Sequence, residues 1–135
     1  MNGLTIGELA KQSNVNLETI RFYEREALLP KPPRLRSGYR SFPAESVQQV
    51  RFIKRAQELG FSLREIKELL ALRNEPRSAS ADVKGRVEQK ISEIDRKMKA
   101  LREMKKELVL LASTCSGATT IESCPIMESL GSDQE

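Results

Sequence analysis

Two cysteines are the residues in this sequence whose types and spacing best suit them to chemistry. Cys115 and Cys124 are separated by eight residues, and a loop of that length lets two thiolates converge on one ion. Thiolates are soft ligands that suit Cu(I), Ag(I), Au(I), Hg(II), Cd(II), Pb(II) or Zn(II). Because histidine is absent, any further ligand would be a carboxylate or a backbone group. A pair of idle or redox-active cysteines is the alternative.

The composition argues against several other classes of protein. Without histidine, a glycine-rich phosphate loop or a CxxC motif, no enzyme is expected. No apolar run reaches the roughly 18 residues of a membrane span, and no secretory signal is seen, so a cytoplasmic protein without a structural disulfide is expected. A net charge of +4 suits a polyanionic partner, although a ribosome-associated or scaffold protein has the same balance.

The N-terminal residues predict two short helices joined by a tight polar turn. Thr5 is a suitable N-cap for the first helix, and Asn16 is a suitable N-cap for the second. This arrangement is typical of a helix-turn-helix, in which the second helix enters the major groove of DNA.

The next residues predict a basic wing and two further helices. The segment 34–42 is rich in arginine and aromatic residues around a Ser-Gly turn, which favours two strands. Pro43 is placed as the first residue of a helix that runs to about Leu59. Ser62 and Glu65 form a capping box that opens a fourth helix, closed near Asn74.

A long helix that begins near Asp82 carries a heptad seam of apolar residues. A helix of about 30 residues is about 45 Å long and cannot bury such a stripe against a small domain alone. The simplest partner is a second copy in a symmetric antiparallel coiled coil; the alternative is a helix folded back on its own domain. The seam residues are Val87, Ile91, Ile94, Met98, Leu101 and Leu108.

Four motifs occur together in a fixed order along the chain. They are residues 19–24 (TIRFYE), 37–40 (SGYR), 52–56 (FIKRA) and 59–63 (LGFSL), and Cys-Pro-Ile follows at 124–126. In this order and spacing the chain resembles the MerR family of transcription regulators along essentially its whole length. Ala27 departs from the glycine that the family often has. A left-handed helix end costs alanine about 1 kcal/mol, so the turn there is expected to differ locally.

The resemblance implies a dimeric winged-helix regulator that binds double-stranded promoter DNA with a long spacer. Such an activator distorts the DNA so that RNA polymerase engages both promoter elements, and its inducer selects between two accessible dimer conformations. Carried over residue by residue, the resemblance places Thr19, Arg21 and Tyr23 on the recognition helix, Arg34, Tyr39 and Arg40 on the wing, and Arg55 on a third-helix backbone contact. Tyr23 and Tyr39 as core residues and Arg55 as a solvated residue are the alternatives.

The resemblance also bears on the choice of metal ion. Members of the family that sense divalent ions have a third cysteine, supplied by the other protomer, at the position of Ser80. Residues 80–84 (SADVK) instead resemble the copper-efflux regulator branch. With two strong ligands, a linear monovalent ion such as Cu(I), Ag(I) or Au(I) is favoured and Zn(II), which prefers four ligands, is disfavoured. Lys84 and the N-terminus of the last helix offset the negative charge of a bis-thiolate complex.

The loop length points toward a different metal. The copper branch commonly has seven residues between its cysteines, whereas eight is the spacing of mercury- and lead-type relatives, so Hg(II) or another soft divalent ion is the alternative. A thiol redox sensor is a further alternative. A drug-binding regulator is disfavoured because about ten residues follow Cys124.

The sequence as a whole predicts a mainly α protein in three parts. Residues 1–75 form a winged helix-turn-helix DNA-binding domain, and residues 76–113 a linker and a long antiparallel coiled-coil dimerisation helix. Residues 114–135 form a metal-sensing loop, a short helix and a tail.

Overall fold

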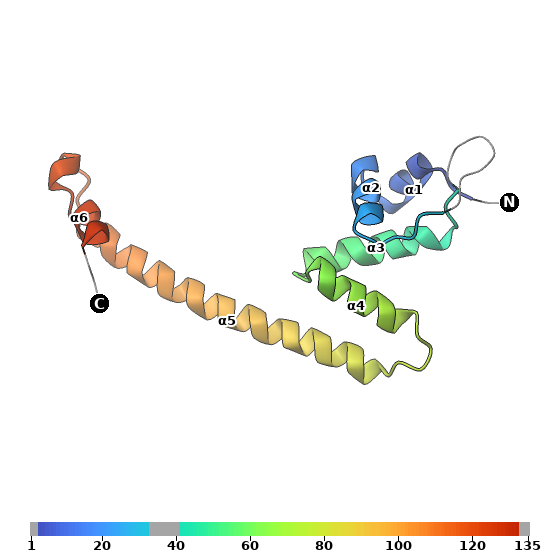
Figure 1. Cartoon of the computed structure of the whole chain (residues 1–135). Coiled ribbons are helices and arrows are strands. Elements are labelled where there is room, and N and C mark those ends of the chain that lie inside the picture. The colour runs from blue at the N-terminus through green and yellow to red at the C-terminus, as the bar shows by residue number, and fades with distance from the viewer. Residues whose placement is uncertain (1–2, 33–40, 133–135) are drawn as a thin grey trace. The chain divides into compact units, whose positions relative to one another are not determined.

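The computed structural model describes residues 3–32 and 41–132 of the chain. Contacts divide the chain into two compact units, Met1–Arg86 and Val87–Glu135. The described part is helical, as predicted, and Figure 1 shows its elements in chain order. They are α1 (Ile6–Ser13), α2 (Leu17–Arg25), α3 (Glu45–Glu58), α4 (Leu63–Arg73), α5 (Ser80–Ser113), a 3-10 turn (Ile121–Ser123) and α6 (Pro125–Gly131).

The predicted helix-turn-helix is confirmed in α1 and α2. The Thr5 hydroxyl accepts from the Glu8 N–H, and the Glu8 carboxylate accepts from the Thr5 N–H, which completes a capping box. The Asn16 side chain accepts from the Thr19 N–H and so caps α2. Between the helices, Asn14 adopts a left-handed conformation with φ of 59°, which asparagine tolerates better than most residues.

The third and fourth helices differ little from their predicted bounds. The capping box of Ser62 and Glu65 opens α4 as predicted. Pro43, however, is not the first residue of α3, because the helix begins at Glu45 and the Pro43 carbonyl accepts from the Ser46 N–H at 3.0 Å. The chain then reverses at Gly60, whose φ of 94° favours glycine.

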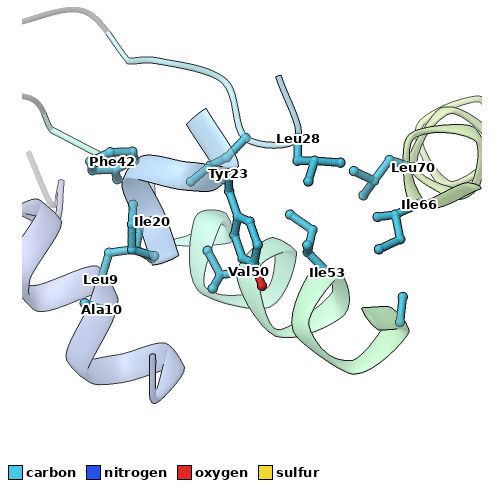
Figure 2. Packing of buried hydrophobic residues seen from close by; sticks show 12 residues of the cluster. Leu9, Ala10, Ile20, Tyr23, Leu28, Phe42, Val50, Ile53, Ile66 and Leu70 are labelled. Carbon is cyan, nitrogen blue, oxygen red and sulfur yellow. The ribbon is translucent and has the colours of Figure 1, made fainter. Parts of the chain in front are cut away.

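One hydrophobic core joins these four helices (Figure 2). Leu9 of α1 and Ile20 of α2 contribute from one side, and Val50 and Ile53 of α3 from the other. Figure 2 also shows the ring of Tyr23 among these side chains. The remaining buried apolar residues of the cluster are Ala10, Leu28, Leu29, Phe42, Ala56, Ile66 and Leu70.

The predicted two-stranded wing falls largely on residues 33–40, which lie outside the described residues. At its margin, Leu4 and Phe42 form an antiparallel bridge with reciprocal backbone hydrogen bonds of 2.7 Å. Phe42 is fully buried. The segment around Phe42 is therefore attached to the N-terminal residues and anchored in the core.

The turn after α2 keeps its left-handed residue although that residue is alanine. Ala27 has a φ of 59°, so the expectation of a locally different turn was wrong. The Leu28 and Leu29 N–H groups both donate to the Tyr23 carbonyl, and both leucine side chains are buried. These contacts hold Ala27 in a conformation that costs an L-residue about 1 kcal/mol.

The long helix α5 is continuous over 34 residues, which corresponds to about 50 Å. It begins two residues before the predicted start at Asp82, so that Ser80 is its first residue. Arg86, the last residue of the first compact unit, forms an ion pair of 3.2 Å with Glu68 of α4. Within the described part of the chain, no helix is long and apolar enough to span a membrane.

Candidate functional site

The two cysteine side chains meet where α5 ends and α6 begins. The Sγ atoms of Cys115 and Cys124 are 3.8 Å apart, and the Gly117 N–H donates to Cys115 Sγ at 3.4 Å. Both cysteines are free and half-buried. Gly117 has a φ of 82°, so the loop turns at a residue that tolerates this conformation. The expectation that the loop lets the two sulfurs converge is met.

Cys124 is the N-cap of α6, and Pro125 occupies the first helical position. Proline has no N–H, so the free donors of this helix end are the following N–H groups, which point toward the cap. Hydrogen bonding from the Met127 N–H, with smaller contributions from Ile126 and Cys115, lowers the pKa of Cys124 against the opposing effect of partial burial. The sequence Cys-Pro-Ile thus favours a thiolate at this end of α6.

The cysteine pair is suited to a soft ion held by few ligands. At a metal–sulfur bond of about 2.3 Å, linear coordination needs about 4.6 Å between the sulfurs. The observed 3.8 Å is shorter, so a linear complex requires the sulfurs to separate slightly, whereas a bent complex does not. Among residues 3–32 and 41–132, no group of three or more His, Cys, Asp or Glu could hold a metal ion. The cysteine pair is therefore considered as a candidate two-thiolate site.

Ser80 and Lys84, the residues predicted to act beside the metal, belong to the first compact unit, and the cysteines belong to the second. Both are exposed in the first turns of α5, whereas Cys115 follows the last residue of that helix. Along the sequence, most of α5 lies between these residues and the cysteines.

Helix α2, the predicted recognition helix, exposes some of the residues predicted to bind DNA. Arg21 forms an ion pair of 3.0 Å with Glu18, and the two side chains are 54% and 73% exposed. The Thr19 hydroxyl donates to the Asn16 side chain at 2.9 Å. Thr19 thus also supports the cap of the helix that it belongs to.

Tyr23 lies differently from the expectation that it faces DNA. Only 2% of the residue is exposed, its ring is in the core, and its hydroxyl donates to Gln57 of α3 at 2.8 Å. Burial raises the pKa of Tyr23, and the nearby Glu58 carboxylate raises it further. The alternative, in which Tyr23 belongs to the core, is correct for the ring. Tyr23 is also one of the residues that line a shallow hollow, together with Asn16 and Lys54.

The third helix holds the turn of the helix-turn-helix in place. Lys54 donates to the Asn14 carbonyl at 3.1 Å, and Arg51 donates to the Gln12 carbonyl at 2.8 Å. These cations neutralise the carbonyl end of α1. Sequence reasoning missed both contacts, because 39 and 40 residues separate the partners. Arg55, predicted to contact DNA, is exposed and forms a 3.6 Å ion pair with Glu58.

Three predicted DNA contacts, Arg34, Tyr39 and Arg40, lie outside the described residues.

The predicted dimerisation seam is described in full, and the exposed fractions of its residues range from 41% at Ile94 to 62% at Leu108. An apolar stripe so exposed in the single chain is available to a partner. The other members, Val87, Ile91, Met98 and Leu101, lie within the same range.

Known proteins resemble this chain over almost its entire length. The chain is 42% identical to the mercuric resistance operon regulatory protein of Bacillus cereus, over 93% of this chain and 95% of that protein. It is 36% identical to the HTH-type transcriptional regulator CueR of Salmonella typhimurium, over 94% and 91%. The crystal structure of PbrR691 from Ralstonia metallidurans in complex with lead(II) matches with a TM-score of 0.86 and 37% identity, over 94% and 98%.

Two family models match this chain, and the regions that they match contain most of its helices. The model for the MerR HTH family regulatory protein matches residues 4–72, which hold α1 to α4 apart from the last residue of α4. The model described as MerR, DNA binding matches residues 47–111, which include most of α5. The chain therefore belongs to the MerR family of DNA-binding transcription regulators, which are not enzymes.

Proposed function

We propose that this chain is a homodimeric, cytoplasmic transcription regulator that responds to a soft metal ion bound by Cys115 and Cys124. The observation that carries the proposal is the 3.8 Å approach of the two thiols. They lie at one end of a helix whose other end is ion-paired to the DNA-binding unit through Arg86 and Glu68. The printed names of the relatives refer to mercury resistance, copper regulation and lead(II), all of which involve soft ions.

The favoured ion is monovalent: Cu(I), Ag(I) or Au(I). Two thiolates satisfy a linear d10 ion, and Ser80 stands where a third cysteine would serve a divalent ion. Hg(II) is the second candidate, because it is also held by two thiolates and because a mercuric regulator is 42% identical to this chain.

The dimer is proposed to form through the apolar seam of α5 in antiparallel orientation. In that arrangement the first turn of one α5 lies near the last turn of the other. Ser80 and Lys84, near the start of one α5, then approach the cysteines of the partner, which follow the end of its α5. The Lys84 ammonium offsets the negative charge of a bis-thiolate complex.

Metal binding is proposed to select one of two conformations of the DNA-bound dimer. The selected conformation distorts a promoter with a long spacer so that RNA polymerase engages both of its elements. Thr19, Arg21, Arg55 and the hydroxyl of Tyr23 are the proposed DNA contacts within the described residues, with Arg34, Tyr39 and Arg40 on the wing. The deformation energy that the protein supplies is on the order of a few kcal/mol.

The decisive experiment titrates Cu(I), Ag(I) and Hg(II) against the reduced protein and against a promoter reporter. One ion per cysteine pair and loss of induction in Cys115→Ser and Cys124→Ser are expected. Ser123→Ala, at an exposed position in the 3-10 turn beside Cys124, is the matched control and retains induction. Induction that survives in both cysteine variants would contradict the site.

Ser80→Cys tests the choice of ion separately. A third thiolate from the partner is expected to broaden the response toward divalent ions, which accept more than two ligands. An unchanged ion profile would contradict the role of Ser80 and leave the cysteine site intact.

A thiol redox switch is the second candidate function, favoured by the same close approach of the two sulfurs. Under reducing conditions a redox switch binds no stoichiometric metal, and its reporter responds to oxidants in metal-free medium. Metal stoichiometry therefore separates the two functions.

A further inference from the structure

An ion pair on the recognition helix has a geometry suited to reading a base pair. Glu18 and Arg21 are three residues apart on α2, so they share one face of the helix. Arg21 Nη1 donates to Glu18 Oε1 at 3.0 Å, and both side chains are mostly exposed. The pair is therefore available to a ligand that approaches the outer face of α2.

Stability alone gives little reason for this pair. An exposed ion pair of this kind contributes little to the free energy of unfolding, because water screens the two charges. A carboxylate on a helix that approaches DNA is repelled by the phosphates, so it weakens binding unless a donor on the DNA compensates for it. An ionised carboxylate only accepts hydrogen bonds. The donors that the major groove offers are the N4 amino group of cytosine and the N6 amino group of adenine.

The pairing of Glu18 with Arg21 favours the amino group of cytosine over that of adenine. Arginine pairs with O6 and N7 of guanine, the commonest specific contact in the major groove. A C·G base pair presents the cytosine amino group beside those two guanine acceptors. The Glu18–Arg21 pair presents an acceptor beside a donor, which is the complementary pattern, and the guanidinium keeps further N–H groups for guanine.

We infer that Glu18 is a specificity-determining residue that reads, together with Arg21, a C·G base pair in each half of the operator. The inference rests on the proposed function, because it requires α2 to enter the major groove of a specific site. Glu18 supplies the contact to cytosine, and Arg21 supplies the contact to guanine. Glu18 also keeps Arg21 oriented before DNA is bound, which limits the side-chain entropy that Arg21 loses on binding.

A structural role for Glu18 makes a different prediction. Glu18 lies in the first turn of α2, where a carboxylate is favoured by the helix dipole. Glu45 has the same placement in the first turn of α3 and is also exposed. Glu45→Ala therefore removes an equivalent first-turn charge away from the recognition helix, and it serves as the matched control.

The experiment selects binding sites from randomised duplex DNA with the full-length wild type, Glu18→Ala, Glu18→Gln and Glu45→Ala. For Glu18→Ala we expect discrimination at one base pair per half-site to fall about tenfold, the effect of one good base contact. For Glu18→Gln we expect the preference at that position to shift toward A·T, because glutamine pairs with N6 and N7 of adenine. Glu45→Ala is expected to select the wild-type site.

Two results would overturn the inference while leaving the proposed function in place. One is a Glu18→Ala site identical to that of the wild type. The other is an equal loss of preference at all positions, which indicates a weakened helix rather than a lost base contact. Failure of the wild type to select any sequence would overturn the proposed function itself and the inference with it. Circular dichroism of each variant verifies that the helices are retained.

Discussion

The two compact units of this chain treat their apolar side chains in opposite ways. In the first unit, residues from four helices, such as Ile53, are fully buried in one core. In the second unit, the large apolar residues of α5, such as Leu101 at 60% exposed, face outward. The first unit therefore buries its apolar side chains within one chain, whereas the second requires a partner to remove its apolar surface from water. The apolar residues of the first unit therefore stabilise the folded chain, and those of the second unit are available for assembly.

The largest expected effect is on the stability of the first unit, whose core is formed within one chain. Ile53→Ala removes a fully buried side chain and leaves a cavity, which lowers the free energy of unfolding by about 2 to 5 kcal/mol. Thermal unfolding followed by circular dichroism measures the loss. The decrease should be the same at low and high protein concentration. A concentration-dependent decrease would mean that the core is completed by a second chain.

The next effect tests the unit that requires a partner. Leu101→Lys places a charge in the exposed seam, and burial of one leucine side chain contributes about 1.5 to 3 kcal/mol. Because a symmetric dimer contains the substitution twice, we expect monomers at concentrations where the wild type is dimeric, as measured by analytical ultracentrifugation. Glu103→Lys, an exposed position on α5 outside the seam, is the control and should remain dimeric. Equal dimerisation of both variants contradicts the seam.

A smaller effect concerns the thiol at the start of α6. The N–H groups at that helix end lower the pKa of Cys124 from its ordinary value of 9.0, so its thiolate persists to lower pH than that of an ordinary cysteine. In Cys115→Ser, the alkylation rate of Cys124 should therefore reach half its maximum at a pH below that ordinary value. A midpoint at or above the ordinary value would contradict the helix-end effect. Metal affinity should fall as the pH falls through the lowered pKa, because protons compete for the thiolate.

The smallest expected effect is on the stability of the first unit, at the turn after α2. Ala27→Gly relieves a left-handed conformation with φ of 59°, and the gain of about 1 kcal/mol is partly offset by the entropy of the unfolded glycine. We expect a small rise in the midpoint of chemical denaturation. An equal or lower midpoint would indicate that the turn holds alanine without strain.

Local patterns in the sequence were sufficient for most helices and their caps. Thr5, Asn16 and Ser62 each bond the backbone three residues ahead, so their role depends on neighbours along the chain. The start of α3 was misplaced by two residues, because a proline is compatible both with the first helical turn and with the turn before it. Conformations that depend on distant contacts, such as that of Ala27, were not predictable in this way.

The sequence by itself determined the helix-turn-helix, the long seam-bearing helix, the family and the two thiols as candidate ligands. It could do so because helix periodicity, caps and motif spacing are all written in local order along the chain. The tertiary structure decided which side chains meet. It placed the ring of Tyr23 in the core, and it attached Lys54 and Arg51 to the carbonyl end of α1. It also brought Cys115 Sγ within 3.8 Å of Cys124 Sγ. The physical reason is that contacts between distant residues depend on how whole helices pack, which no local pattern specifies.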